Sequence, residues 1–439
     1  MTAAALPVAA HLGLLVTFDL AAHLPTTLFW LAVAMVGLVL GARQLGRQPV
    51  SGAAGLLAVA ALLRLLLLPL PPSLSDDVHR YLWDGRVAGL GLNPYSLTPD
   101  APELASLRDE LWERLPHRDV TTVYPPLAIG LFSIASRLPH PVAALKGLLA
   151  LLDLASCALL VLLARRLGLP VSRVAWYAWN PLVTLEVAGM GHIDALGVTA
   201  VLLTVLLLLA RPQRTLLAGL AAAAGVLAKL VPLIALPAWA RRSRRPGRFL
   251  LAAVGLVILA LAPIGLASGG VPAGLVRYGV SWEFNGPLYE PLWRLLERLE
   301  VQAAISSGLD LVKSRTGRIE FWNRLYPLNY PQLLARGLLA VGLLGALVLA
   351  WRERRLAPAM GRIFGAMVVF SATVYPWYLL WVLPWAALCR QPAWLALSGL
   401  VLLSYLPQFR PIALVPWVYL LIWGPFFLLL LWRSRWSTD

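Results

Sequence analysis

The sequence predicts an all-α polytopic membrane protein that forms a single domain over residues 1–439. Hydrophobic residues make up 59% of the chain and charged residues only 13%, whereas soluble proteins carry about 25% charged residues. Apolar runs of the length that crosses a bilayer recur along the whole chain, and we expect about 11 to 14 crossings. Two long hydrophilic loops, 71–141 and 268–331, interrupt these runs. This pattern excludes a soluble domain with one membrane anchor.

The candidate spans follow one another along the chain. Short polar connecting segments, here called joints, lie between them. Several are shorter than the roughly 20 residues that cross a bilayer, so we expect some to pair as broken or re-entrant helices. The candidates lie at about 6–21, 26–42, 53–70, 142–164, 174–190, 194–210, 215–228, 230–240, 249–267, 332–351, 361–374, 376–389, 394–406 and 412–432.

The net charge of +16 indicates membrane topology rather than nucleic-acid binding. Nineteen arginines lie in the short joints, accompanied only by Glu353 and Asp439. Basic joints of this kind are typical of the cytoplasmic side. Both long loops then face away from the cytoplasm, and they hold 15 of the 21 acidic residues. We therefore expect a multi-pass protein of the cell membrane with an extracytoplasmic working surface, in contact with membrane lipids and not with nucleic acid.

Parts of both loops are expected to be helical. Residues 104–112 and 288–299 place leucines on one face at helical spacing, which predicts helices along the membrane interface. Tyr124-Pro125-Pro126-Leu127 opens an apolar run that ends near Leu138. Proline in the first turn predicts a helix start there. This run is too short to span a bilayer alone, so we expect it to be partly immersed at the outer face.

An acidic pair, Asp76 and Asp77, follows directly on the span 53–70. Charge is costly near a bilayer, so acids at this position predict a functional site. One of the two carboxylates could act as a general base toward a hydroxyl nucleophile. The alternative is that Ser75 and the pair only cap a helix, because Ser and Asp are favoured at helix starts.

Aromatic and polar residues of the first loop could bind a sugar. Tyr81, Trp83 and Tyr95 offer flat surfaces of the kind that sugars pack against, and Asp84 and Asn93 lie beside them. Asn-Pro is a turn signal, so the alternative is a loop held together by turns and interfacial aromatic residues.

A second cluster, at Asn180, Glu186, His192 and Asp194, lies between two spans on the expected outer face. Polar groups at that depth must be satisfied or used. His192 and Asp194 are too few to indicate a metal site. Binding a phosphate, or positioning the acids of the first loop, is the favoured interpretation. A structural hydrogen-bonded cap is the alternative.

Two isolated cations are candidates for binding a lipid-linked phosphate. Lys229 interrupts an Ala-rich span near its outer end, and Arg410 stands between two spans on the same face. Lys229 could hold a phosphate as a point charge, or it could reach to the lipid headgroups instead. The aromatic turns 375–378 and 405–411, which are expected on the outer face, are interpreted as parts of an aromatic belt.

Together these residues resemble the GT-C superfamily of membrane glycosyltransferases, and in particular bacterial polyprenol-phosphate-mannose-dependent mannosyltransferases. The shared pattern is a span, an acidic pair, an interfacial loop, a Pro-Pro-Leu helix and many later spans with Arg-rich joints. The two spans within residues 1–45 precede the core of this resemblance. The motifs that carry it are Asp76-Asp77, Tyr81, Asp84-Gly85, Asn93-Pro94-Tyr95 and Tyr124-Pro125-Pro126-Leu127.

The resemblance implies transfer of a hexose, with mannose favoured, from a polyprenyl-phosphate-linked donor to a lipid or glycan acceptor on the outer face. The carboxylate acts as base and the anomeric centre is inverted. It favours Asp76 as the base, with Asp77 the choice if the alignment slips by one residue. No cofactor is implied, and a divalent metal is not indicated. The implied substrate-binding and phosphate-binding residues are Arg80, Tyr81, Trp83, Asp84, Asn93, Tyr95, Tyr124, Asp194, His192, Lys229 and Arg410.

A polytopic transporter or lipid flippase is the competing interpretation. Transporters often show internal repeats and broken helices that carry charge near the bilayer midplane. The two halves of this sequence show no duplicated pattern, and its acids lie in loops. A glycosyltransferase is therefore favoured.

Overall fold

The computed structural model describes residues 2–47, 52–210, 213–317, 319–323, 330–409 and 415–432, and within them the regular structure is helical. Five of the described helices are long and apolar enough to cross a membrane. They are α2 (Leu24–Arg47), α7 (Pro141–Arg166), α13 (Pro246–Ala267), α18 (Pro331–Arg352) and α23 (Val415–Trp432). Several shorter apolar helices accompany them. The predicted all-α polytopic membrane fold is confirmed.

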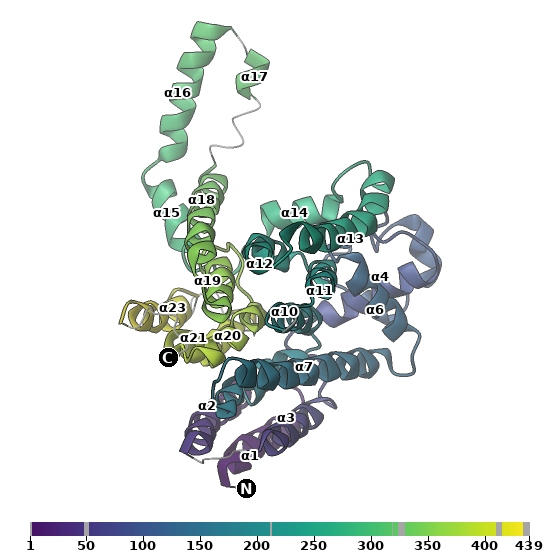
Figure 1. Ribbon diagram of the computed structural model, residues 1–439. Helices are drawn as coiled ribbons and strands as arrows, with labels where there is room; N and C mark the ends of the chain where they lie inside the picture. The colour runs from purple at the N-terminus through teal and green to yellow at the C-terminus, as the bar shows by residue number, and fades with distance from the viewer. Residues whose placement is uncertain are drawn as a thin grey trace.

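The N-terminal helices pack against the rest of the bundle. α1 (Thr2–Thr17) lies along α2 and α3 (Ala53–Leu67), and α3 packs on α7 (Figure 1). The ring of His11, from α1, is hydrogen-bonded to Thr184 Oγ1 at 2.8 Å. The first two spans are therefore continuous with the core.

The chain between α7 and α10 (Asp194–Leu208) is a series of short helical pieces, so the candidate span at 174–190 is broken, whereas the sequence predicts only that some of the spans are. Pro181 lacks an amide proton, and Asn180 Oδ1 accepts from the Leu182 amide, so a new helix begins there. The pieces are η2 (Val171–Val174), α8 (Ala175–Ala178), α9 (Pro181–Thr184) and the π-turn η3 (Leu185–Gly189). This break brings His192 and Asp194 to the start of α10.

Next along the chain, α11 (Thr215–Ala228) packs between α10 and α13 (Figure 1). It ends at Lys229, whose backbone is extended. A 3₁₀ turn, η4 (Val231–Ala235), and α12 (Leu236–Arg242) then lead to α13. The end of α11 therefore leaves Lys229 in a bend between two helical pieces.

The first loop is built on two helices that touch closely. α4 (Asp77–Gly89) packs on α6 (Pro126–Ser136), and a Cβ on Gly85 would lie only 2.3 Å from the Phe132 carbonyl carbon. The predicted helix start at Pro125-Pro126 is confirmed. The single helix predicted over 104–112 is wrong. A 3₁₀ turn, η1 (Pro102–Leu107), ends there, and Asp109 caps a separate helix, α5 (Glu110–Glu113), by accepting from two backbone amides.

The second loop contains α14 (Ala273–Ser281), α15 (Tyr289–Arg298), α16 (Val301–Thr316) and α17 (Ile319–Asn323). α15 confirms the predicted helix over 288–299, and α16, with α17 beside it, projects away from the other helices (Figure 1). Between α14 and α15, Phe284 exchanges backbone hydrogen bonds with Ala372 and Val374. This contact ties the second loop to the chain that precedes η6 (Pro376–Trp381).

The C-terminal third completes the bundle on the side opposite α4 and α6 (Figure 1). α18 packs on α19, and α21 packs on α23. The remaining elements are α19 (Leu356–Val369), α20 (Leu383–Leu388), α21 (Pro392–Leu400), η7 (Val401–Ser404) and α22 (Tyr405–Phe409).

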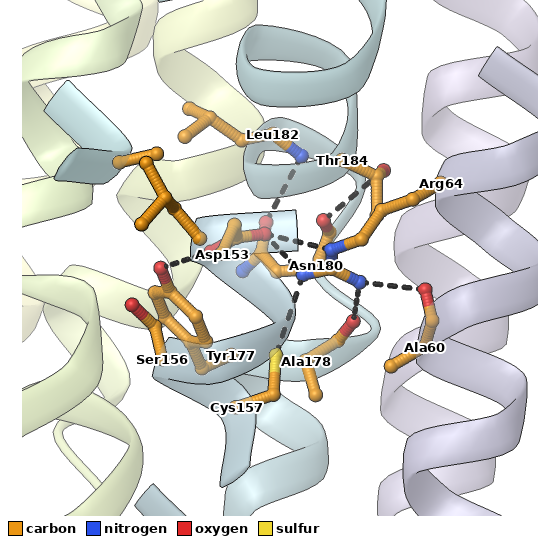
Figure 2. A network of polar contacts seen from close by, with 12 residues as sticks. Ala60, Arg64, Asp153, Ser156, Cys157, Tyr177, Ala178, Asn180, Leu182 and Thr184 are labelled. Atoms are coloured by element: carbon orange, nitrogen blue, oxygen red, sulfur yellow. Dashed lines mark hydrogen bonds and ion pairs between the residues drawn. The ribbon is translucent and has the colours of Figure 1, made fainter. Parts of the chain in front are cut away.

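A buried ion pair joins α3, α7 and α8 (Figure 2). Arg64 Nε donates to Asp153 Oδ2 at 2.7 Å, and Arg64 Nη1 donates to the carbonyls of Ala60 and Ala178 at 2.8 Å. Tyr177 Oη donates to the second Asp153 oxygen at 2.6 Å. Charges inside a bilayer must be paired in this way. The pair fixes α3, which leads to Asp76, against α8, which leads to His192.

Candidate active site

A cavity of about 700 Å³ lies where the two hydrophilic loops meet the helix bundle. Its walls come from stretches that are far apart in sequence. The lining residues fall within 73–80, 116–125, 229–231, 275–282 and 367–381, with Arg336. The cavity therefore brings together the acidic pair, Tyr124, Lys229 and the aromatic turn at 375–378, which sequence reasoning had singled out separately.

The acidic pair forms one wall of this cavity. Asp76 is exposed and precedes the first turn of α4, and Asp77, half-buried, opens that helix. Asp76 makes no side-chain cap bond, so helix capping does not account for it. Tyr81 Oη donates to Asp77 Oδ2 at 3.2 Å, and the Tyr81 ring stacks on Phe132 at 4.6 Å.

The protonation of Asp77 is tuned by its surroundings. Burial raises the pKa of the Asp77 carboxyl to about 6, although Lys229 and the Tyr81 hydroxyl act in the opposite direction. Asp194 and Asp76 contribute further repulsion between like charges. A carboxyl group whose pKa lies near neutrality is suited to accept a proton during catalysis.

Lys229 reaches the same cavity and is held there by an acid. Its Nζ donates to both carboxylate oxygens of Asp194 at 2.8 Å and lies 5.0 Å from the centroid of the Tyr378 ring. Trp381 Nε1 also donates to Asp194, at 2.5 Å. Asp194 is fully buried, whereas the Lys229 side chain is 21% exposed. The ammonium group is thus fixed at the cavity wall, with donor capacity left for a ligand.

His192 lies behind the cavity wall. Its side chain is fully buried and is absent from the lining. Ser75 and Trp377, which do line the cavity, contact it: Nε2 is 3.2 Å from Ser75 Oγ, and its ring stacks on Trp377 at 3.8 Å. In this arrangement His192 reaches a ligand only through these two residues, so the geometry agrees with positioning rather than with direct phosphate contact.

Arg80 and Tyr124 line the cavity as well. Arg80 also braces the loop, because its guanidinium donates to Asp84 Oδ1 at 2.9 Å and to the carbonyls of His117 and Val120. Asp84 is buried beneath this ion pair and is not part of the lining. The ion pair of Arg80 and Asp84 therefore holds the first loop in place around the cavity.

Three other expected sugar-binding residues lie away from the cavity lining. Trp83 is buried in a small apolar cluster with Leu104. Asn93 Oδ1 accepts from the Tyr95 amide at 2.9 Å in a turn, and Tyr95 Oη donates to the Tyr124 carbonyl at 2.9 Å. In this arrangement Trp83, Asn93 and Tyr95 contact other residues of the first loop.

The second loop and α18 contribute residues that sequence reasoning missed. Arg336 lines the cavity, and its Nη2 donates to the Trp282 carbonyl at 3.1 Å and to Glu283 Oε1 at 3.0 Å. Trp282 lines the cavity beside it. The available signal was a cation inside an otherwise apolar span, because such residues are commonly functional.

Arg410, the second expected phosphate ligand, lies outside the described residues. In the part of the chain that the structure describes, no three His, Cys, Asp or Glu side chains gather as a metal site would require.

An all-α polytopic membrane fold, with an acidic pair that follows the apolar helix α3 and faces a cavity between two loops, fits a GT-C membrane glycosyltransferase. The chain belongs to the α-(1→6)-mannopyranosyltransferase family, because the model of the N-terminal domain of that family matches residues 1–243, more than half of the chain. The match begins at residue 1 and so includes α1 and α2. A comparison with curated proteins found no match. The protein is thus a glycosyltransferase, and its family activity is mannosyl transfer.

Proposed function

We propose that the protein transfers mannose from a polyprenyl-phosphate-linked donor to a hydroxyl of a lipid or glycan acceptor, at the outer face of the cell membrane. The observation that carries this proposal is that Asp77 and Lys229 face one cavity, from α4 and from the end of α11. A base and a cation on the same cavity are what glycosyl transfer from a phosphate donor requires.

Lys229 is proposed to hold the donor phosphate. The bond from the anomeric carbon to the phosphate oxygen breaks with its electron pair on phosphate, so negative charge grows there. A cation fixed in advance stabilises such charge. Asp194 holds the ammonium group at 2.8 Å and so limits its motion. Arg410 is the proposed second cation. We propose that this charge stabilisation works without a divalent metal.

Asp77 is proposed as the base, and Asp76 as the residue that orients the acceptor. The hydrogen bond from Tyr81 fixes one Asp77 oxygen, and the raised pKa suits proton uptake. The acceptor O–H proton passes to Asp77 while the acceptor oxygen bonds to the anomeric carbon. The phosphate leaves from the opposite face, so the configuration inverts.

The lipid carrier is proposed to pack against the apolar residues of the cavity lining. Leu230, Val231, Leu275 and Met367 are among them. An isoprenoid chain loses little by leaving the bilayer for such a surface, because both are apolar. A nucleotide sugar has no such hydrophobic tail, and the extracytoplasmic loops proposed here would not meet one.

The proposal is tested with the purified protein in vesicles and a panel of labelled sugars linked to polyprenyl phosphate. Mannose should be transferred to a lipid or glycan acceptor, and the product should have the anomeric configuration opposite to that of the donor. Transfer from a nucleotide-linked mannose, with none from the polyprenyl donors, would overturn the donor assignment and leave the family activity intact.

A further inference from the structure

A line of four side chains, Ser75, His192, Glu186 and Tyr405, runs from the cavity into the buried interior. Ser75 Oγ, at the cavity, lies 3.2 Å from His192 Nε2. His192 Nδ1 lies 3.4 Å from Glu186 Oε2, and Tyr405 Oη donates to the other Glu186 oxygen at 2.8 Å. Both His192 and Glu186 are fully buried. The mechanism proposed above uses neither of them.

The imidazole ring of His192 is held in a single orientation. It stacks on Trp377 with centroids 3.8 Å apart, and Trp377 in turn stacks on Tyr375 at 4.5 Å. The His192 amide donates to the Glu186 carbonyl at 2.9 Å, after Gly191 turns the chain with φ of +82°. Backbone and ring are thus both fixed, and Nε2 points at Ser75.

The polar atoms of this line can be satisfied in two ways. His192 Nδ1 and Glu186 Oε2 face each other, and neither has another partner. Two buried acceptors facing each other are costly, so one proton lies between them. With that proton on Nδ1, the Ser75 hydroxyl donates to Nε2. With it on Glu186, Nε2 carries the ring proton and donates to Ser75 Oγ. Ser75 is engaged by His192 in both arrangements.

Ser75 also lies next to the proposed base. The backbone amide of Asp77 donates to Ser75 Oγ at 3.4 Å. The serine oxygen therefore lies at the first turn of the helix that carries Asp77. Ser75 lines the cavity, so the hydrogen-bonding capacity that remains on its Oγ is available to a ligand there. We propose that Ser75 hydrogen-bonds the reacting hydroxyl of the acceptor beside Asp77, and that His192, backed by Glu186, is a positioning residue for Ser75. This inference rests on the proposed function.

Ser75→Ala and Ser75→Thr test the contact. Loss of one hydrogen bond in the reacting geometry should lower kcat/KM for the acceptor about tenfold to a hundredfold in Ser75→Ala, with the donor KM within about twofold. Ser75→Thr keeps the hydroxyl and should retain most of the rate. Ser156→Ala is the matched control, because Ser156 Oγ is hydrogen-bonded to Thr199 Oγ1 at 2.8 Å away from the cavity. A normal rate in Ser75→Ala would overturn the proposal.

The positioning role of His192 is tested by coupling. His192→Leu combined with Ser75→Ala should lose no more than Ser75→Ala alone, because both remove the same contact. Independent, multiplied losses would overturn this role. Glu186→Gln keeps the hydrogen-bonding shape and should stay within about threefold of the parent rate. If Glu186→Gln lost as much rate as Ser75→Ala, Glu186 itself would take up a proton, and the positioning role of His192 would also be overturned. If His192→Leu does not fold, the two Ser75 variants still decide the proposal.

The outcomes separate this inference from the proposed function. An unmodified protein that fails to transfer mannose from polyprenyl phosphate refutes the proposed function. An active protein in which Ser75→Ala changes neither kcat nor the acceptor KM refutes the inference alone.

Discussion

Lys229 Nζ lies 2.8 Å from each carboxylate oxygen of Asp194, so the one lysine of the cavity is held by a fully buried acid. The arrangement balances two charges before any donor arrives. Removing either partner alone would leave the other charge uncompensated, which is strongly destabilising in a buried site. The two residues must therefore be tested together as well as singly.

Donor binding should depend on Lys229. Lys229→Met combined with Asp194→Asn removes both charges, preserves local neutrality and should raise the donor KM about tenfold or more, because a charge-assisted contact contributes roughly 1.5–3 kcal/mol. The acceptor KM should hardly change. Steady-state kinetics in vesicles measure both values, and an unchanged donor KM in a stably folded double variant would return Lys229 to a structural role.

The rate should fall in acid through protonation of Asp77. Its pKa is raised to about 6, so the carboxylate is present above that pH and is lost below it, about tenfold per unit. Lys229 lowers this pKa, whereas Asp194 and Asp76 raise it. Lys229→Met should therefore move the acid limb to higher pH. The assignment of Asp77 as the base would be contradicted if the transfer rate fell only near pH 4. It would also be contradicted if Lys229→Met did not change the pH at which the rate falls.

Both long loops should be accessible from outside the cell. Cysteines introduced at Ser106 and Ser307, which are exposed, should react with an impermeant thiol reagent in intact cells. The native Cys157 and Cys389 are buried and should not compete. Gly247→Cys, exposed in the first turn of α13 beside the Arg-rich segment 241–248, is the control and should react only after permeabilisation. The reverse labelling pattern would place the cavity on the cytoplasmic side.

The buried pair of Arg64 and Asp153 should stabilise the bundle only as a pair. Arg64→Met alone leaves a buried carboxylate and should destabilise the protein by about 3–5 kcal/mol. Arg64→Met with Asp153→Leu removes both charges and should recover most of this loss. Thermal unfolding in detergent measures the difference, and equal melting temperatures for the single and double variants would contradict the account.

The features that could be predicted from the sequence are those that depend on a short stretch of residues. The apolar runs predicted apolar helices, five of which among the described residues are long enough to cross a membrane. Pro125-Pro126 predicted the start of α6 (Pro126–Ser136), because proline geometry acts over one segment. The acidic pair stood out for the same reason, since charge directly after a span is visible in sequence. The break between η1 and α5 was missed, because the cap at Asp109 outweighed the leucine spacing.

Long-range pairings could not be predicted. Arg64 and Asp153 are 89 residues apart, and Arg336 reaches the cavity from a helix that sequence alone describes as a plain span. His192 and Asp194 were singled out as a pair, but the fold separates them. Asp194 holds Lys229, whereas His192 turns toward Ser75. Which neighbour each takes depends on packing between elements distant in sequence.

The transfer rates of Asp76→Asn and Asp77→Asn test the central claim most directly. Asn keeps the size of Asp and cannot accept the proton, and general-base catalysis contributes about 10²–10⁴-fold. We predict that Asp77→Asn, expressed at normal levels, loses at least about a hundredfold in mannosyl transfer while donor binding persists, and that Asp76→Asn loses less. A loss confined to Asp76→Asn would move the base to Asp76. Near-full transfer in both variants would contradict the claim that this cavity is the catalytic centre.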